Sequence, residues 1–300
     1  MGIETDMNSN VKKGVTYAIL IVYSIFCLFP IYWLASTSLK PFTTIFTATP
    51  TYLFPIDTVW YQAILTYIPS WKIELATTGA ITAESGGWYY IVPYLINSAI
   101  IATAATLITV FIAAFAAYGF SRFDFKSKQT FQFMLLSTRF APPIAILLPF
   151  FIIYSHIGLR DTLQGLVLLY TFFNMSIAVL LMKSFIDDIP KDYDESSILD
   201  GAGRFQTFIR VILPTARYGF AATAILIFIF NWNEFIAALI LTFLHARTLP
   251  VAMSTFVTAY GTEWGMISAA GIVAILPVFI FALLTQRYLV RGLTFGTVKG

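Results

Sequence analysis

The chain has 300 residues, of which 58% are hydrophobic and only 11% are charged. Soluble globular proteins carry about 25% charged residues, so this composition excludes a soluble enzyme or binding module and indicates a chain solvated mainly by lipid. The formal net charge of +3 is too small to suggest nucleic acid as a partner, and the lone Cys27 can form no internal disulfide.

Six apolar runs follow one another along the chain, at 15–38, 92–118, 130–154, 163–186, 218–243 and 266–286. A hydrocarbon core of about 30 Å needs about 20 residues of helix, and backbone exposed to lipid must satisfy its own hydrogen bonds. The runs are also too long for barrel strands. The sequence therefore predicts an all-α integral membrane protein with about six transmembrane helices, built as a single membrane domain over 1–300.

The distribution of lysine and arginine predicts the orientation in the membrane. With the N-terminus in the cytoplasm, the internal segments hold thirteen of these residues and the external segments four, while Arg139 remains within a span. Because cations accumulate on the cytoplasmic side, both termini (1–14 and 287–300) and the loop 187–216 are expected inside. The loop 39–91 is then external, either as a cap on the outer membrane face or as an ordinary solvent loop.

The most polar segment between two apolar runs is 189–214. Pro190 suits the first turn of a helix, and three acidic residues follow where the helix dipole favours them: Asp192, Asp194 and Glu195. Gly201 can end this helix in a left-handed conformation. A second helix is expected from near Gly203 to Pro214, with one apolar stripe formed by Phe205, Phe208, Ile209 and Ile212. Such a stripe packs either on the protein's own bundle or in a groove on a partner.

This segment resembles the EAA loop of ATP-binding-cassette (ABC) import permeases. The matching positions are Glu195-Ser196-Ser197, Asp200-Gly201-Ala202 and Val211-Ile212-Leu213-Pro214. The two serines replace the usual alanines and keep their small size. The resemblance implies that 190–202 is a coupling helix, lying between spans four and five, that docks on an ATPase subunit. The residues expected to couple to that subunit are Asp194, Glu195, Ser196, Ser197, Asp200, Gly201 and Ala202.

Two further stretches resemble the sugar class of these permeases. They are Phe230-Asn231-Trp232-Asn233-Glu234-Phe235 and the C-terminal stretch 286–300, which looks like the closing motif of the maltose-type partner permease. The resemblance implies a heterodimer with a second permease subunit, two ABC ATPase subunits and an extracellular solute-binding protein that delivers a sugar of the maltose or trehalose type. It also implies that the tail, through Arg291 and Lys299, contacts the ATPase subunits.

The polar residues within apolar runs include Arg139, Asn231, Asn233 and Glu234, which are costly at bilayer depth and usually face the bundle interior or water. Three of them, Asn231, Asn233 and Glu234, are expected to line the translocation path or the interface between permeases. The alternative is structural, with an ion pair between Arg139 and Glu234 or a hydrogen bond between helices.

The sequence offers no chemistry for ATP hydrolysis, since it contains no G-x-x-x-x-G-K-[ST] loop. His156, His245 and Cys27 lie far apart, so no metal site and no catalytic residues are predicted. The expectation is a transport subunit in the cell membrane, not an enzyme, with no cofactor of its own and with ATP and magnesium held by the partner ATPase. The alternatives are an ABC permease for a non-sugar solute and an ion-coupled secondary transporter, which would show an internal duplication.

Overall fold

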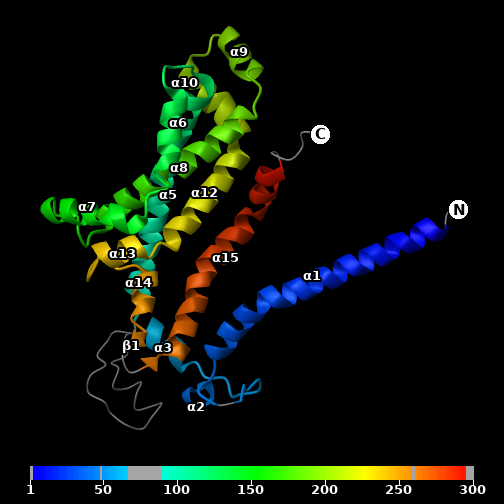
Figure 1. Cartoon of the computed structure of the whole chain (residues 1–300), viewed down its shortest axis with the longest axis vertical. Coiled ribbons are helices and arrows are strands. Elements are labelled where there is room, and N and C mark those ends of the chain that lie inside the picture. Colours follow the sequence, from blue (N-terminus) through cyan, green and yellow to red (C-terminus); the bar gives the residue numbers. More distant parts are fainter. Residues whose placement is uncertain (1–2, 48, 67–89, 259–260, 295–300) are drawn as a thin grey trace. The chain divides into compact units, whose positions relative to one another are not determined.

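The computed structural model describes residues 3–47, 49–66, 90–258 and 261–294 (Figure 1). Helices dominate this part of the chain, which confirms the predicted all-α class. The exception is a hairpin of two short antiparallel strands, β1 (Val257–Thr258) and β2 (Gly261–Thr262), paired as Val257 with Thr262 and Thr258 with Gly261. The chain divides into two compact units, Met1–Ile91 with Phe256–Ile275, and Val92–Thr255 with Leu276–Gly300. A single membrane domain over 1–300 stays a prediction.

The first unit is built on the long helix α1 (Ile3–Thr37), which begins well inside the predicted N-terminal segment 1–14. Between residues 15 and 33 its large apolar side chains are mostly exposed. A helix that is apolar all round and unburied suits a lipid environment. Two short helices follow in the loop 39–91, α2 (Phe42–Ile45) and α3 (Val59–Leu65); residues 67–89 of that loop lie outside the described part.

Trp60 of α3 holds the described part of this loop together. Its ring is buried and its Nε1 donates to the carbonyl oxygen of Lys40 over 2.7 Å. The Lys40 ammonium lies 4.6 Å from the centroid of the Trp33 ring and 5.2 Å from that of Phe54. Gly265, near the start of the helix α15 (Trp264–Thr294), allows the contact, because a Cβ there would come 2.3 Å from the Trp60 ring. These contacts order the described part of the loop. The role of the loop as an outer cap stays a prediction.

The second unit is centred on three helices that run side by side, α5 (Val92–Arg122), α8 (Leu163–Asp187) and α12 (Arg217–Trp232) (Figure 1). Small residues allow them to approach closely, as is usual between membrane helices. Gly219 of α12 faces Phe185 of α8, and a Cβ at position 219 would lie 2.2 Å from that ring. Fully buried alanines contribute in the same way: Ala105, Ala113, Ala117 and Ala178.

Shorter helices complete the second unit. They are α6 (Lys128–Ser137), α7 (Pro143–His156), α9 (Asp192–Leu199), α10 (Arg204–Thr207), the π-helix η1 (Phe208–Ile212), α11 (Leu213–Thr215), α13 (Ile236–Leu241) and α14 (Leu249–Ser254). One apolar cluster lies at the end of the bundle next to α9, where Phe208 and Ile212 pack against α5 and α8. A second joins α7, α13 and α14 to the same two helices.

Among the described residues, four helical stretches are long and apolar enough to cross a membrane: Lys12–Thr37, Val92–Arg122, Leu163–Asp187 and Trp264–Leu283. A fifth would be the pair Arg204–Thr215 and Arg217–Trp232, which is bent by 77°. The third predicted run, 130–154, is not one helix. Pro142 and Pro143 interrupt it, because proline removes a backbone donor and disfavours helix at the residue before it. The count of six spans and the position of both termini stay predictions.

Three side chains fix the connection between α13 and α14. Asp161, at φ 55° and buried, accepts hydrogen bonds from four consecutive backbone N–H groups, those of 243–246, over 2.9–3.2 Å. The Asn97 amide donates to the carbonyls of His245 and Arg247 at 2.9 and 3.0 Å. The Ser98 hydroxyl accepts from the N–H of Leu249 at 2.8 Å. This connection is thus tied to the beginnings of both α5 and α8.

Candidate functional site

The loop 189–214 forms two helical arms joined by a glycine turn, as the sequence predicts. Gly201 adopts φ 85°, and its N–H donates to the carbonyl oxygen of Ile198 at 2.9 Å, while Ala202 donates to that of Ser197 at 3.1 Å. The acidic residues fall in the first turn of α9, where the dipole favours them. The Gly203 N–H donates to the side chain of Gln206 at 3.2 Å and so begins α10.

The second arm departs from the prediction at Pro214, which does not end it. Helical structure continues through α10, η1 and α11 to Thr215, and the chain bends at Ala216 before α12. Pro214 lies in the first turn of α11, a position where a missing N–H is tolerated. Of the predicted apolar stripe, Phe208 and Ile212 are buried in the bundle, whereas Phe205 is 66% exposed.

Asp194 anchors α9 to the end of α5. Its carboxylate accepts from Arg122 Nε at 2.8 Å and from the Tyr118 hydroxyl at 3.2 Å. The side chains of Arg122 and Asp194 are only 3% and 5% exposed. Arg122 also donates to the carbonyl oxygen of Ile189 at 2.8 Å. The structure therefore places Asp194 beneath α9, where it positions the helix, and away from the exposed side on which a partner could dock.

A second set of contacts continues this anchor to the end of α8. The hydroxyl of Ser121 donates to Asp187 at 2.6 Å, and Lys183 pairs with the same carboxylate one turn earlier. Sequence reasoning did not identify Tyr118, Ser121, Arg122 or Asp187 as part of the site. The sequence did contain one signal for these contacts. Arg122 follows the second apolar run, and a cation that lies next to the loop 189–214 needs an acidic partner.

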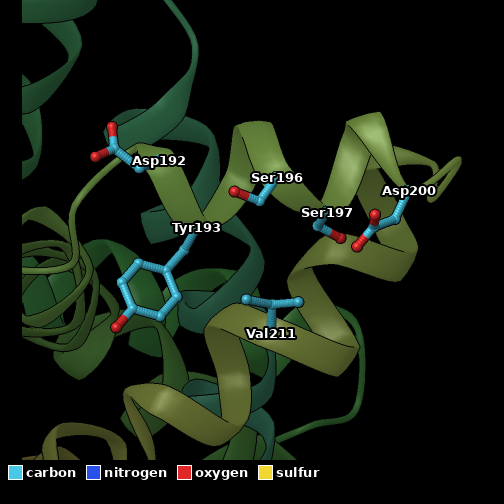
Figure 2. A pocket seen from close by; sticks show the side chains of 6 residues that line it. All are labelled: Asp192, Tyr193, Ser196, Ser197, Asp200 and Val211. Atoms are coloured by element: carbon cyan, nitrogen blue, oxygen red, sulfur yellow. The ribbon is translucent and has the colours of Figure 1, made fainter.

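The opposite side of α9 is open. Glu195, Ser196 and Asp200 are exposed, and Leu199 is 88% exposed at the tip. Ser197 is half-buried, and its hydroxyl lies 3.1 Å from that of Thr207. A shallow hollow lies between α9 and η1, as Figure 2 shows, and is lined by Asp192, Tyr193, Ser196, Ser197, Asp200 and Val211. Three of the predicted coupling residues, Ser196, Ser197 and Asp200, thus line a surface that combines small, acidic and apolar side chains.

The three polar residues predicted in the fifth run have three different environments. Asn231 is buried, donates to Thr106 at 3.1 Å and accepts from Asn174 at 2.8 Å, so it joins α12 to α5 and α8. Asn233 is exposed just after α12 and donates to the carbonyl of Ile229 at 2.9 Å.

Glu234 lies two residues before α13, and its carboxylate accepts from the N–H groups of Ala237 at 2.9 Å and Ala238 at 3.2 Å. Its carboxylate is not paired with Arg139 among the ion pairs of the described residues. The ion pair between Arg139 and Glu234, which the sequence offered as a structural alternative, is therefore absent from the described part of the chain. The first N–H groups of a helix have no partner within the helix, and a carboxylate placed just before the helix can accept hydrogen bonds from them.

The predicted ATPase-contact residues of the tail are only partly described. Arg291 falls in the last turn of α15. Lys299 lies outside the described residues, so its contact, like that of Arg291, stays a prediction.

Comparison with known proteins supplies the family context. Residues 109–295 match the family described as binding-protein-dependent transport system inner membrane component. The trehalose/maltose transport system permease protein MalG of Thermococcus litoralis is 34% identical over 298 residues, covering 98% of this chain and all of its own length. The trehalose transport system permease protein SugB of Mycobacterium tuberculosis is 35% identical, covering 92% of this chain and 93% of its own.

A solved structure has the same fold. It is a chain of a bacterial ABC transporter involved in the import of the acidic polysaccharide alginate, and it aligns with a TM-score of 0.71 over 93% of this chain and 97% of its own length. At 20% identity this likeness concerns the fold alone.

Proposed function

The chain belongs to the family of inner membrane components of binding-protein-dependent transport systems, and from this membership we propose that it is one half of the membrane channel of an ATP-driven sugar importer. It is a multi-pass permease subunit and not an enzyme. Relatives that cover nearly the whole chain are named for trehalose and maltose transport, and another, DasC of Streptomyces coelicolor, for diacetylchitobiose uptake. Their names support a disaccharide or short oligosaccharide as the solute.

The partners in this proposal are a second permease subunit, two ABC ATPase subunits and an extracellular solute-binding protein. ATP and magnesium act on the ATPase subunits. Closure of those subunits then moves the permease pair between inward-open and outward-open states, because the motor has different affinities for the two. This chain contributes half of the gated path and the arm through which the movement enters.

The observation that carries the proposal is the contrast between the two sides of α9. Its inner side is fixed to α5 through the buried pair of Arg122 and Asp194, so the helix cannot shift without pulling on the bundle. On its outer side, the side chains of Leu199, Glu195 and Ser196 are exposed. A rigid helix with an exposed apolar tip suits insertion into a groove on a partner, and the ATPase subunit is that partner in the proposal.

Leu199→Asp tests the docking directly. Because Leu199 is 88% exposed, this change should leave the fold intact while placing a desolvated charge in the interface, and we expect binding of the ATPase subunit to fall at least tenfold. Leu53→Asp is the matched control, since Leu53 is 96% exposed and lies in the other unit. Co-purification of the ATPase with the permease pair is the measurement. Equal recovery with both variants would show that α9 is not the docking element.

A further inference from the structure

Arg139 lies where the third apolar run is interrupted. The helices on either side, α6 with 10 residues and α7 with 14, reach about 15 and 21 Å at a rise of 1.5 Å per residue, so neither crosses a bilayer alone. The turn 138–142 between them therefore falls within the apolar depth of the protein. Non-helical backbone at that depth is tolerated only where protein buries it or where it lines a water-filled cavity.

The contacts of Arg139 place it against α8 and α12. Its Nη1 donates to the carbonyl oxygen of Phe173 at 3.2 Å, and its guanidinium lies 5.9 Å from the centroid of the Phe230 ring. The neighbouring Thr138 hydroxyl donates to Ser176 at 3.3 Å. The residue is nevertheless exposed. An arginine has five N–H donors and stays charged, so most of its donors are turned away from these partners.

No carboxylate neutralises this cation among the described ion pairs, which join Arg122 to Asp194, Lys128 to Asp124 and Lys183 to Asp187. Glu234, the acidic residue predicted as a possible partner, instead accepts hydrogen bonds from two backbone N–H groups of α13. A charged arginine that faces lipid at the bilayer centre is energetically unfavourable. Water, a polar ligand or a polar group of the second permease must therefore cover the guanidinium in the assembled membrane protein, and the first two place it in a water-filled path.

A second helix interruption lies beside the first. Phe230, whose ring lies near the Arg139 guanidinium, occupies the last turn of α12, and Asn233 is the residue that caps this helix three positions later. Asn233 is exposed, and its amide nitrogen donates to Ile229, whereas its side-chain oxygen accepts no hydrogen bond from the residues that the structure describes. The two interruptions thus bring together a donor-rich cation, an aromatic ring and an amide acceptor.

We propose that Arg139, Phe230 and Asn233 form this subunit's share of the solute site in a water-filled translocation path, and that Arg139 determines specificity for solutes rich in hydroxyl or carboxylate oxygens. This inference rests on the proposed function. Hydroxyl and carboxylate oxygens accept from guanidinium, the ring gives an apolar platform, and the amide oxygen accepts from a hydroxyl. A solute bearing an ammonium group is repelled by the same cation. Asn231, held inside the bundle, positions α12 and does not line the site.

Thiol labelling tests whether this face meets water. Cys27 is the chain's one cysteine and is exposed on the apolar helix α1, so the wild-type importer, reconstituted with all its partners, is the lipid-facing control. Asn233→Cys in a Cys27→Ser background is then treated with a membrane-impermeant charged thiol reagent. We expect labelling at least tenfold faster than that of Cys27, slowed by millimolar trehalose or maltose. Labelling no faster than that of Cys27 in every nucleotide state would overturn the proposal and would show that lipid or the second permease covers this face.

Transport by Arg139 variants tests the specificity. Arg139→Met should lower kcat/KM for ATP-driven trehalose or maltose uptake at least tenfold and should relax discrimination against an amino sugar, while Arg139→Lys keeps the charge and restores part of the discrimination. Arg160→Met is the matched control, because Arg160 also stacks on a ring, 4.0 Å from the centroid of Phe151, but is half-buried and lies outside the helices. Unchanged uptake by Arg139→Met overturns the proposal.

Different results would overturn the proposed function and the proposed solute site. If the wild-type importer takes up neither sugar with ATP, the proposed function is wrong. If wild-type uptake is normal and only the Arg139 and Asn233 results fail, the importer assignment stands and this site does not. Should Arg139→Met prevent assembly with the second permease, labelling of Asn233→Cys alone decides, since it keeps Arg139 in place.

Discussion

At the scale of single residues, the strongest electrostatic feature is the pair of Arg122 and Asp194, whose side chains are almost completely buried. Such a pair is weak evidence for net stabilisation, but removing one partner leaves an uncompensated buried charge. We expect Arg122→Met to lower the free energy of unfolding by about 3–5 kcal/mol, measured by denaturant unfolding of the purified subunit in detergent.

The exposed pair of Lys128 and Asp124 is the matched control, since surface ion pairs contribute about 1 kcal/mol or less. Lys128→Met should therefore change little. Combining Arg122→Met with Asp194→Leu should recover part of the lost stability, because no charge is then left buried. A single Arg122→Met variant as stable as Lys128→Met would contradict the anchoring role.

Asp161 makes a second prediction, which depends on pH. Burial alone raises the pKa of Asp161, but the hydrogen bonds from His245, Ala246, Phe243 and Leu244 outweigh it and hold the pKa below its usual value. A carboxyl whose folded pKa is lowered stabilises the protein above its unfolded pKa of about 3.9, and this stabilisation is lost as the pH falls through the folded pKa.

The variant Asp161→Asn should therefore be less stable than wild type near neutral pH, by about 1.5–3 kcal/mol, the range for hydrogen bonds to a charged acceptor. The difference should begin to shrink below about pH 4, where the carboxyl of the unfolded chain takes up protons, and should be lost once the pH falls through the lower pKa of the folded state. Thermal unfolding in detergent at pH 7, 5 and 3 measures this. A difference that stays constant with pH would show that the charge of Asp161 contributes nothing; Asp124→Asn serves as the exposed control.

At the scale of helices, the packing of α12 on α8 depends on Gly219. A Cβ there would come within 2.2–2.6 Å of three atoms of the Phe185 ring, so Gly219→Ala forces the ring or the helix to shift. We expect the free energy of unfolding to fall by about 1–3 kcal/mol, the usual cost of overpacking, and assembly with the second permease to be reduced.

Gly119→Ala in α5 is the control, because nothing lies within 4 Å of a Cβ at that position. This variant should leave the free energy of unfolding unchanged or raise it by up to about 1 kcal/mol. Equal stability of the two variants would contradict this account of the packing.

The helix α9 is held at both ends, which suits it to transmit movement. Asp194 fixes its first turn to α5, and the Ser197 hydroxyl contacts Thr207 at the start of the second arm. Phe208 and Ile212 then bury that arm in the core cluster of the bundle. A displacement of α9 by a docked partner would reach α5 and α8 through packed side chains and an ion pair, without a flexible joint in between.

At the scale of the whole molecule, the parts predicted well from sequence are those that depend on neighbouring residues. Helices α5, α8 and α15 follow from continuous apolar runs, and the left-handed turn at Gly201 follows from the only residue type that adopts φ > 0 readily. The prolines of the third run were visible in the sequence, but whether they bend or separate a helix depends on what packs around them.

The parts that sequence could not supply depend on contacts between distant segments. Arg122 and Asp194 are 72 residues apart, and Asn174 meets Asn231 across 57 residues. Pairing Arg139 with Glu234 was a reasonable charge argument, yet the carboxylate satisfies the N-terminal N–H groups of α13 instead. Asp194 is predicted as a coupling residue because it lies in the motif, and that role stays a prediction; its burial against Arg122 is visible only in three dimensions.

The central claim is that energy from ATP, used by separate subunits, enters this chain through α9 and opens a path for sugar. Uptake of radiolabelled trehalose and maltose into proteoliposomes that contain the permease pair, its ATPase and its binding protein tests this most directly. The account predicts uptake with ATP available to the ATPase subunits and none with a proton or sodium gradient alone. Uptake by the permease subunits driven by such a gradient, with the ATPase absent, would contradict it.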